Sequence, residues 1–478
     1  MRSRLHCWLT DEEIEKIHRA TLEILWERGM KVEHVRGRNL LADAGAAVDG
    51  QSHMVRFPPD LVERCLEIVP GDFAMGGRHG VNVSLGMKSP IAVRSTSGAE
   101  GYIGLKSREY HMGTTADLIE WTRLLDNMQH VDICAGFYPL DVPSHTRDVF
   151  TVKTMLENTV KPIFLNPYDV DTLQAVIDMA VVICGSETAL KKRPIVSILT
   201  SATAPGVILE YCVDQLILAG KYGVPVEVNT GSVMGGTSPV TMAGCILQNN
   251  VEILSLIVIS QLASPGTPLI HRGITMAMDM STGTGLMGAI ECALAQAATA
   301  QLVKTKYKIP VSSNGPMTDA KISDGQSQIE RTILTLLSGL TGTDLLLAPG
   351  YIESLYSVDP VQLVIDDEII GYLKRIISGI NVNETTLAKD IIKGMPSGGN
   401  YLTEMHTVEN FRSEYHLPKI FNRDARETWS KAGAKDLNMK AQERAVHILK
   451  TCQPEPLAQE IQKELGTIYE AITKRKMG

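Results

Sequence analysis

A small set of polar residues carries the chemistry that this sequence could perform. His271 and Arg272 stand together at the end of one apolar run, and Asn166, Asn229 and Asn314 end three others. A guanidinium can bind a carboxylate through two parallel hydrogen bonds, and a histidine can move a proton or orient a substrate. The structural alternatives are a salt bridge for Arg272 and a hydrogen-bonded packing role for His271.

Aromatic residues follow the same apolar runs. Phe137, Tyr138 and Tyr351 do so in a chain of which only 5% is aromatic. A quaternary ammonium has no hydrogen-bond donor, so ring faces are its main binding partners in proteins. The alternative for each ring is core packing. As a group, these residues predict a binding site for a cation.

Other catalytic patterns are missing from the sequence. We find no carboxylate pair at the ends of the runs, and no GxSxG, Walker or GxGxxG motif. The eight cysteines are scattered, with no CxxC or HxC pair. Such spacing is typical of reduced thiols in a cytoplasmic protein and gives no reason to expect a zinc site. We therefore predict no metal ligands.

Eight apolar runs separate these residues and predict the elements that position them. They are rich in branched side chains and lack strict polar alternation, which is typical of parallel strands buried on both faces. A helix-length segment follows each run, so we expect an α/β protein with a (β/α)8 TIM barrel, whose chemistry lies in the loops after the strands. The runs span residues 91–98, 131–137, 162–167, 194–200, 225–231, 268–274, 310–315 and 345–352.

The 478 residues exceed the roughly 250 of a bare barrel. We expect a helical N-terminal cap over 1–90, the catalytic barrel over 91–380, and a helical C-terminal extension over 381–478 that packs on the barrel. Thr10 is a candidate N-cap and Gly29 a stop for the first helix. Helical spacing also marks residues 384–395, 438–451 and 455–476.

The loop that follows the run over 225–231 is rich in glycine. Gly235, Gly236, Thr237 and Ser238 lie in the segment GSVMGGTSPVT (231–241), where Ser238 could cap a helix that begins at Pro239. A helix start offers free amide donors, so this loop is a candidate site for an anion or for contact with a cofactor. The alternative is an ordinary capped loop.

The charge pattern excludes several classes of partner. A net charge of −8 and a pI near 5.9, without clusters of Lys and Arg, argue against nucleic acid. The most apolar helical segment, 241–263, is interrupted by Gln248, Asn249, Asn250 and Glu252, so we expect no membrane span. We expect a cytoplasmic protein that could form a homo-oligomer.

Four segments together resemble the trimethylamine:corrinoid methyltransferase superfamily. They are GSVMGGTSPVT (231–241), SDGQSQIER (323–331) with the preceding DAK (319–321), LVIDDEI (363–369) and MHTVENFR (405–412). The resemblance implies a barrel, a methylamine or betaine donor, and corrinoid (cobalamin) on a separate corrinoid protein as methyl acceptor. Founding members use pyrrolysine near the position of the loop from Thr318 to Gln326, whereas every residue here is standard. The chain thus resembles the branch that uses quaternary amines.

From this resemblance we expect a methyltransferase with glycine betaine as its preferred donor. The trimethylammonium group would face Phe137, Tyr138 and Tyr351, and the carboxylate would bind Arg272 or His271. Asn229 and Asn314 would orient the donor. We further expect Asn166 as a binding residue, His271 and Asn229 as catalytic residues, and the loop Gly235, Gly236, Thr237 and Ser238 facing the corrinoid or an anion.

Three alternatives remain open at the level of sequence. The donor could be proline betaine or carnitine, which would change only the pocket size. The chain could be a noncatalytic betaine-binding protein. It could also be an unrelated barrel lyase or aldolase with a Schiff-base lysine, for which Lys321 is the nearest candidate, although a salt bridge with Asp319 or Asp324 suits that lysine better.

Overall fold

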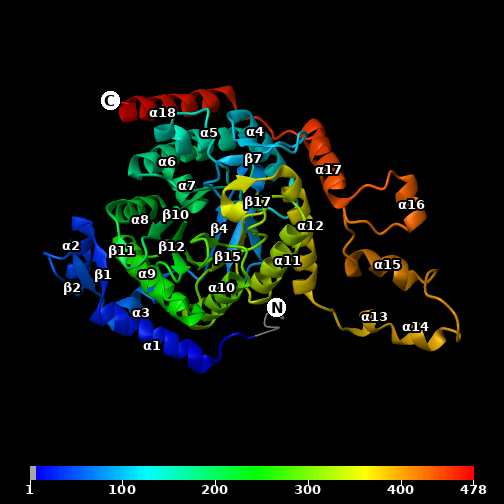
Figure 1. Ribbon diagram of the computed structural model, residues 1–478, viewed down its shortest axis with the longest axis horizontal. Helices are drawn as coiled ribbons and strands as arrows, with labels where there is room; N and C mark the ends of the chain where they lie inside the picture. The colour runs from blue at the N-terminus through cyan, green and yellow to red at the C-terminus, as the bar shows by residue number, and fades with distance from the viewer. Residues whose placement is uncertain (1–6, 478) are drawn as a thin grey trace.

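A computed structural model describes residues 7–477 (Figure 1). The first helix begins as predicted, because Thr10 and Glu13 form a capping box at its start, and Gly29 follows its end with a φ of 76°. The first 90 residues also contain short strands. In order the elements are α1 (Asp11–Glu27), β1 (Met30–Val32), α2 (Val35–Asp43), β2 (Ala47–Val48), β3 (Met54–Arg56), α3 (Pro59–Ile68), β4 (Asp72–Gly76) and β5 (Asn82–Gly86).

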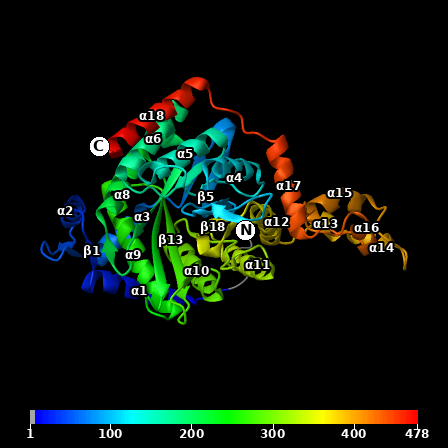
Figure 2. The same cartoon turned by 45° about the horizontal axis from the view of Figure 1, so that its top comes forward.

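A curled sheet of parallel strands lies at the centre (Figure 2). One part pairs β9, β10, β12 and β13 in that order, and another pairs β15, β16 and β6. Most predicted runs contain one of these strands. The strands of the curled sheet are β6 (Ala92–Arg94), β9 (Ile163–Leu165), β10 (Val196–Ala202), β12 (Val226–Met234), β13 (Leu269–Met278), β15 (Ser312–Asn314) and β16 (Leu345–Leu347).

Single parallel bridges join the two parts of the sheet. They connect Arg94 to Ile133, Cys134 to Ile163, and His271 to Val311. The predicted strand over 131–137 is therefore reduced to two bridging residues. The predicted run over 345–352 is not one strand, because Ala348 turns the backbone with a φ of 73°.

The residues after that turn belong to a second, small sheet. Its strands are β7 (Gly101–Ile103), β8 (Tyr110–Met112), β17 (Tyr351–Ile352) and β18 (Ser357–Val358). Two further short strands, β11 (Val207–Ile208) and β14 (Gly285–Leu286), follow β10 and β13.

Helices cover the outer side of the curled sheet, and α9 and α10 flank β13 (Figure 2). Among the described residues α9 alone is long and apolar enough to span a membrane, but 72% of its most apolar window is buried inside the protein, as in a core helix. The helices are α4 (Thr115–Asn127), α5 (Arg147–Asn158), α6 (Val170–Cys184), α7 (Glu187–Lys192), α8 (Glu210–Tyr222), α9 (Met242–Ala263), α10 (Ile290–Leu302), α11 (Gly325–Leu340) and α12 (Pro360–Ser378).

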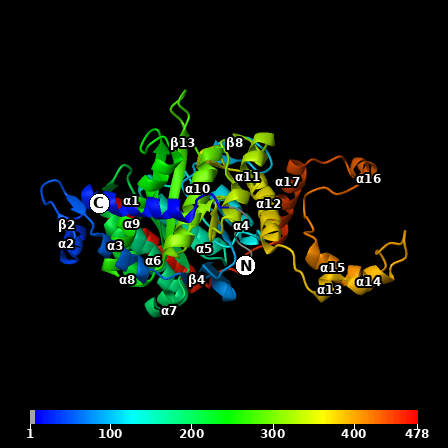
Figure 3. The same ribbon diagram turned by 90° about the horizontal axis from the view of Figure 1, so that it is seen from below.

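The C-terminal helices differ in how they pack. α17 lies on α12 and α4, and α18 lies on α5 and α6, whereas α13 to α16 contain no buried residue and project from the body (Figures 1 and 3). The predicted helix over 384–395 is split at Ala388, which has a φ of 50°. The bounds are α13 (Glu384–Leu387), α14 (Lys389–Gly394), α15 (Met405–Glu414), α16 (Arg426–Lys431), α17 (Leu437–Thr451) and α18 (Gln459–Met477).

The fold is therefore a mixed α/β fold with a curled parallel sheet and a high helical content. The domain boundaries near residues 90 and 380 stay a prediction.

Candidate functional site

Charged side chains from different strands meet on the inner face of the curled sheet. Arg94 of β6 donates to both carboxylate oxygens of Glu227 of β12, at 2.5 and 3.0 Å. Arg272 of β13 lies 3.4 Å from the same carboxylate, and Ser312 of β15 donates to it at 3.1 Å. The Arg94 guanidinium also stacks on Phe164, 3.5 Å from the ring centroid. We call Arg94, Glu227, Arg272 and Ser312 the inner cluster.

The inner cluster contains two guanidinium groups and one carboxylate. Burial would raise the pKa of Glu227, but the charges of Arg94 and Arg272 outweigh burial and hold that pKa below its usual value. Burial and the like charge of Arg94 together lower the pKa of Arg272 to about 9. Two guanidinium groups face one carboxylate, so the cluster carries one positive charge in excess.

Unpaired polar atoms surround this excess charge. Arg272 Nε has no hydrogen-bond partner among the described residues, and neither does Oδ1 of Asn229 or either side-chain atom of Asn314. All three residues are buried. Asn229 and Asn314 stand two residues after Glu227 and Ser312, so they share the inner face one layer nearer the carboxyl ends of the strands. Buried polar groups usually have partners, which makes these three candidates for binding a ligand.

His271 lies on the other face of β13. Its Nε2 is 3.4 Å from Asn250 Oδ1 of α9, and Asn250 in turn donates to Tyr307 and Thr21. Burial lowers the pKa of His271 to about 3, so the imidazole is neutral. The structure thus brings Arg272, Asn229 and Asn314 together but places His271 against the outer helices.

The predicted aromatic residues fall into separate groups. Tyr138 donates to the backbone carbonyl of Asn166 at 2.9 Å, and its ring lies 5.3 Å from that of Tyr168. Phe137 packs on Tyr102 at 5.5 Å. Asn166 is exposed at the end of β9.

Tyr351 is buried and has other partners. Its hydroxyl donates to the carbonyl of Thr96, and its ring centroid lies 5.9 Å from that of Trp121. Burial raises the pKa of both Tyr138 and Tyr351, so both phenols are neutral.

The glycine-rich loop lies at the tip of β12. Gly235 has a φ of 84°, and Thr237 Oγ1 accepts from Val233 N at 3.0 Å. Ser238 is not the N-cap that we predicted, because α9 begins at Met242 and Thr241 caps it by accepting from Gly244 N. The turn from Gly235 to Ser238 is closed by its own hydrogen bonds, which shifts the helix start three residues onward.

Exposed apolar side chains lie beside this loop. A Cβ built on Gly235 would be 3.5 Å from Met280 and 3.6 Å from Val240, and both side chains are exposed. β12 and β13 pair as far as Met234 and Ala277, well beyond the three-residue strands of the sheet. The carboxyl edge of the sheet therefore carries an apolar projection.

The loop that follows β15 is held by a carboxylate. Glu330 of α11 accepts from Thr318 Oγ1 at 2.5 Å and from the backbone N–H of Asp319 at 2.9 Å. Lys321 is exposed and donates to the carbonyl of Asp319 at 2.7 Å. This lysine is a surface loop residue, unlike the buried amine that a Schiff base requires.

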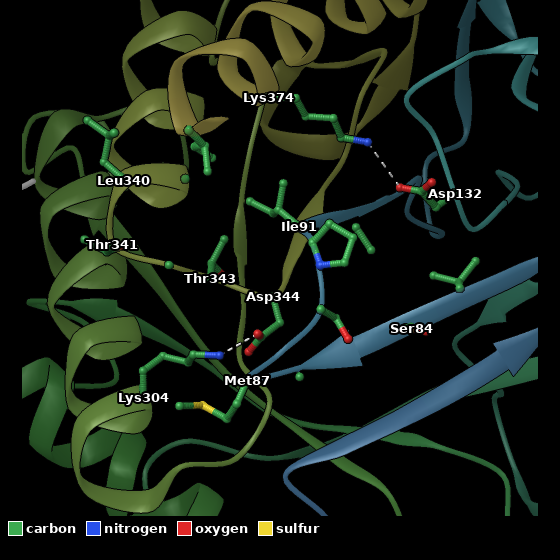
Figure 4. Close-up of a pocket in the computed structure, with 18 of the residues that line it drawn as sticks. Ser84, Met87, Ile91, Asp132, Lys304, Leu340, Thr341, Thr343, Asp344 and Lys374 are labelled. Carbon is green, nitrogen blue, oxygen red and sulfur yellow. Dashed lines mark hydrogen bonds and ion pairs between the residues drawn. The ribbon is translucent and has the colours of Figure 1, made fainter. Parts of the chain in front are cut away.

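A cavity of about 560 Å³ lies at the opposite edge of the sheet, at the amino ends of β6 and β16 (Figure 4). Lys304 and Asp344 pair across it at 2.5 Å, and Lys374 and Asp132 at 3.7 Å. No aromatic residue lines it. Because its charges are already paired and it offers no ring face, it suits a cationic substrate poorly.

The predicted site lacks Arg94 and Glu227, although both lie inside the predicted runs 91–98 and 225–231. The signal was available, since a charge within an apolar strand must find a partner when it is buried. Among residues 7–477 no group of three His, Cys, Asp or Glu side chains is placed to hold a metal ion. The unpaired groups of Arg272, Asn229 and Asn314 could bind an anionic group.

Curated relatives match this chain along nearly its whole length. It is 32% identical over 463 residues to the trimethylamine methyltransferase MttB of Desulfitobacterium hafniense (strain DSM 10664 / DCB-2), covering 96% of this chain and 93% of the relative. It is 26% identical over 460 residues to the glycine betaine methyltransferase of Desulfitobacterium hafniense (strain Y51), covering 96% and 95%.

A solved structure supports the fold. The Methanosarcina barkeri monomethylamine methyltransferase (MtmB) superposes with a TM-score of 0.50 at 13% identity, covering 92% of this chain and 88% of that one. The model of the trimethylamine methyltransferase (MTTB) family matches residues 3–478. With these relatives, the match shows that the chain belongs to the trimethylamine methyltransferase family.

Proposed function

We propose that this protein transfers a methyl group from a quaternary amine that carries a carboxylate, with glycine betaine as the preferred donor, to the corrinoid of a partner protein. The observation that carries the proposal is the excess positive charge of the inner cluster. A trimethylamine molecule has no anionic group to compensate that charge, whereas a betaine has one.

The proposal includes closure of the sheet into a (β/α)8 barrel. Three strand segments separate β6 from β12 in the order of pairing, so a flat sheet would hold Arg94 and Glu227 about 19 Å apart. The 2.5 Å contact between them supports closure. So do the single bridges at Ile133, Cys134 and Val311, which link neighbouring parallel segments between the two parts of the sheet.

The carboxylate of the donor binds Arg272 in this proposal. Arg272 Nε is unpaired, and its Nη1 makes only a 3.4 Å contact with Glu227. A donor carboxylate would neutralise the excess charge, and the amides of Asn229 and Asn314 would complete its hydrogen bonds. His271, which faces α9, has no part in this arrangement.

The trimethylammonium group lies toward the carboxyl edge, where Tyr138 and Tyr168 offer neutral ring faces. Its N–CH₃ bond breaks with the electron pair left on nitrogen, so the donor departs as a neutral dimethylated amine and needs no proton. This explains why a site without an acid and base pair suffices. A tertiary amine would leave as an amide anion, and every residue of this chain is a standard amino acid.

A corrinoid on the partner protein would supply Co(I) as the nucleophile that accepts the methyl group. The carboxyl edge fits such a partner, because exposed Val240 and Met280 project beside the loop Gly235 to Ser238. The residues of this chain would orient the donor and exclude water. The purified protein should therefore be colourless, and tightly bound cobalamin would contradict the assignment to a partner.

A substrate panel tests the proposal. The protein is incubated with Co(I) cobalamin and with glycine betaine, proline betaine, carnitine or trimethylamine, and the demethylated amine is quantified. We expect glycine betaine to react fastest. Trimethylamine should react at least about 100-fold more slowly, because the leaving group of trimethylamine is far poorer. Equal rates on trimethylamine and glycine betaine would contradict the proposal. Faster reaction of proline betaine or carnitine would replace the preferred donor.

A further inference from the structure

Asp148 is a buried carboxylate close to the two tyrosine rings at the carboxyl edge. It lies in the first turn of α5 and is 1% exposed. One of its oxygens accepts from the backbone N–H of Tyr168 at 3.0 Å, and the other accepts from Val149 N at 2.9 Å. Burial, and after it the charge of Asp148, raise the pKa of Tyr168 to about 12. Burial, Tyr168 and Asp148 also raise the pKa of Tyr138, so the carboxylate lies within electrostatic reach of both phenols.

The other charges around these rings have partners of opposite sign. Arg147, which precedes Asp148, lies 3.7 Å from Glu100. The C-terminal helix α18 lies on α5 and α6 (Figure 1), and its Lys476 pairs with Asp169 at 2.9 Å. Among the described residues, no Lys, Arg or His side chain forms an ion pair with Asp148 itself. One negative charge is therefore in excess at a buried position.

A buried carboxylate without a cation is costly. Burial accordingly raises the pKa of Asp148, while its backbone hydrogen bonds and the charge of Lys476 act in the opposite direction. A cation bound next to the rings would stabilise the charged form of this carboxyl group. The position is thus suited to a positively charged ligand.

This excess charge has the opposite sign to that of the inner cluster. Arg272 and Arg94 leave one positive charge in excess there, and Asp148 leaves one negative charge here. Tyr351 lies within electrostatic reach of both places. Burial dominates the pKa of Tyr351, but Arg94 lowers it, and Tyr351 in turn adds to the raised pKa of Tyr138. A betaine carries a carboxylate and a quaternary ammonium, so one molecule would compensate both charges.

We propose that Asp148 is a specificity-determining residue whose carboxylate attracts the quaternary ammonium of the donor, while the rings of Tyr138 and Tyr168 contact its methyl groups. The inference rests on the proposed function, because it concerns the positive end of the same donor. An exposed charge would be screened by water, but a buried carboxylate acts over several ångströms. Asp148 therefore makes the site select a charged amine over an uncharged group of the same shape.

Two ligands that differ only in charge test this role. The tert-butylacetate anion has the shape and the carboxylate of glycine betaine, with carbon in place of the quaternary nitrogen. Calorimetry measures the affinity of the full-length wild type and of Asp148→Asn for both ligands. We expect the variant to bind glycine betaine at least about tenfold more weakly. Its affinity for tert-butylacetate should stay within about threefold of the wild type or rise, because only a repulsion is removed.

Asp141→Asn is the matched control. Asp141 also accepts a backbone N–H, that of Thr115 at 2.9 Å, and lies three residues after Tyr138, but it is exposed to water. Because water screens its charge, the affinity for both ligands should change by less than about twofold. An asparagine at position 148 keeps an oxygen that can accept from Tyr168 N, and circular dichroism checks that both variants are folded.

Equal weakening of both ligands in Asp148→Asn would overturn the inference, since the residue would then act only through the position of Tyr168. Unchanged binding of glycine betaine would overturn it too, and so would an equally large effect of Asp141→Asn. These three results would leave the proposed function standing, because the wild type would still bind glycine betaine. A wild type that does not bind glycine betaine would overturn the proposed function and this inference together.

Discussion

Two buried arginine clusters in this protein differ in how completely they are paired. Arg331 of α11 is fully buried, and all its nitrogen atoms have partners: Nε donates to Ser327 Oγ at 2.9 Å, Nη1 to Asp366 and to the carbonyl of Pro316 at 2.7 and 2.6 Å, and Nη2 to the carbonyl of Tyr351. One cation meets one carboxylate there. In the inner cluster, two cations share one carboxylate and Arg272 Nε is unpaired.

The difference separates a structural group from a binding group. A buried charge without a partner costs stability. At a purely structural position every donor of such a charge is therefore expected to have a hydrogen-bond partner, as at Arg331. The inner cluster has one charge in excess and an unpaired Arg272 Nε, and the neighbouring amides of Asn229 and Asn314 are unpaired as well. An anionic ligand would supply what is missing, which makes the cluster the best candidate for binding a carboxylate.

Replacing Arg331 by methionine should produce the largest loss of stability. Asp366 would lose its ion pair while fully buried, and burial already raises the pKa of Asp366 to about 6. We expect the free energy of unfolding to fall by about 3 to 5 kcal/mol, the range for removing one partner of a buried pair. Denaturant unfolding measures this, and a loss below about 1 kcal/mol would show that the cluster is not structural.

The pH dependence of the free energy of unfolding should reveal that His271 is held neutral in the fold, in contrast to its charged neighbour Arg272. The pKa of His271 is lowered from 6.5 to about 3 by burial, so below pH 6.5 the unfolded chain binds a proton that the folded chain does not. Stability is therefore complete above pH 6.5 and is lost as the pH falls toward 3. Between pH 7.5 and 5.5 this contributes a loss of roughly 1 to 2 kcal/mol.

His271→Asn should remove that contribution. Unfolding curves at pH 7.5, 6.5 and 5.5 for both proteins would show a smaller decline for the variant. The same decline in both proteins would mean that His271 is not held neutral in the fold.

The smallest effect on stability is expected for Arg272→Met. Glu227 would keep Arg94, so the variant would hold one cation and one carboxylate instead of two cations and one carboxylate. The change leaves no uncompensated charge behind and removes the desolvation cost of a buried guanidinium, which offsets the lost contact with Glu227. We expect the free energy of unfolding to change by less than about 1 kcal/mol. A loss equal to that of Arg331→Met would abolish the distinction between the two clusters.

Strand periodicity accounts for what could be predicted from the sequence. The apolar runs identified β9, β10, β12 and β13, and polar residues at their ends pointed to Asn229 and Arg272. Neighbouring residues of a strand point to opposite faces, so His271 and Arg272 could not both face the inside of the curled sheet. The alternation rule alone does not tell which of the two residues faces inward. That decision needs another residue that is known to lie on the inner face.

Long-range pairing could not be predicted from the sequence. Arg94 and Glu227 are 133 positions apart, and their contact depends on how the sheet curls. The start of α9 was misplaced for a local reason, since Ser238 and Thr241 are both suitable caps and the hydrogen bonds of the preceding turn decide between them. The projection of α13 to α16 from the body gave no signal either, because their segments have ordinary helical patterns.

The central claim is that the surplus guanidinium of Arg272 binds the carboxylate of the donor. Calorimetric titration of the wild type and of Arg272→Met with glycine betaine and with choline, which lacks the carboxylate, tests it most directly. We predict that the variant binds glycine betaine about 30- to 1000-fold more weakly, equivalent to about 2 to 4 kcal/mol, while its affinity for choline changes by no more than about threefold. Unchanged binding of glycine betaine, or equal weakening of both ligands, would contradict the claim.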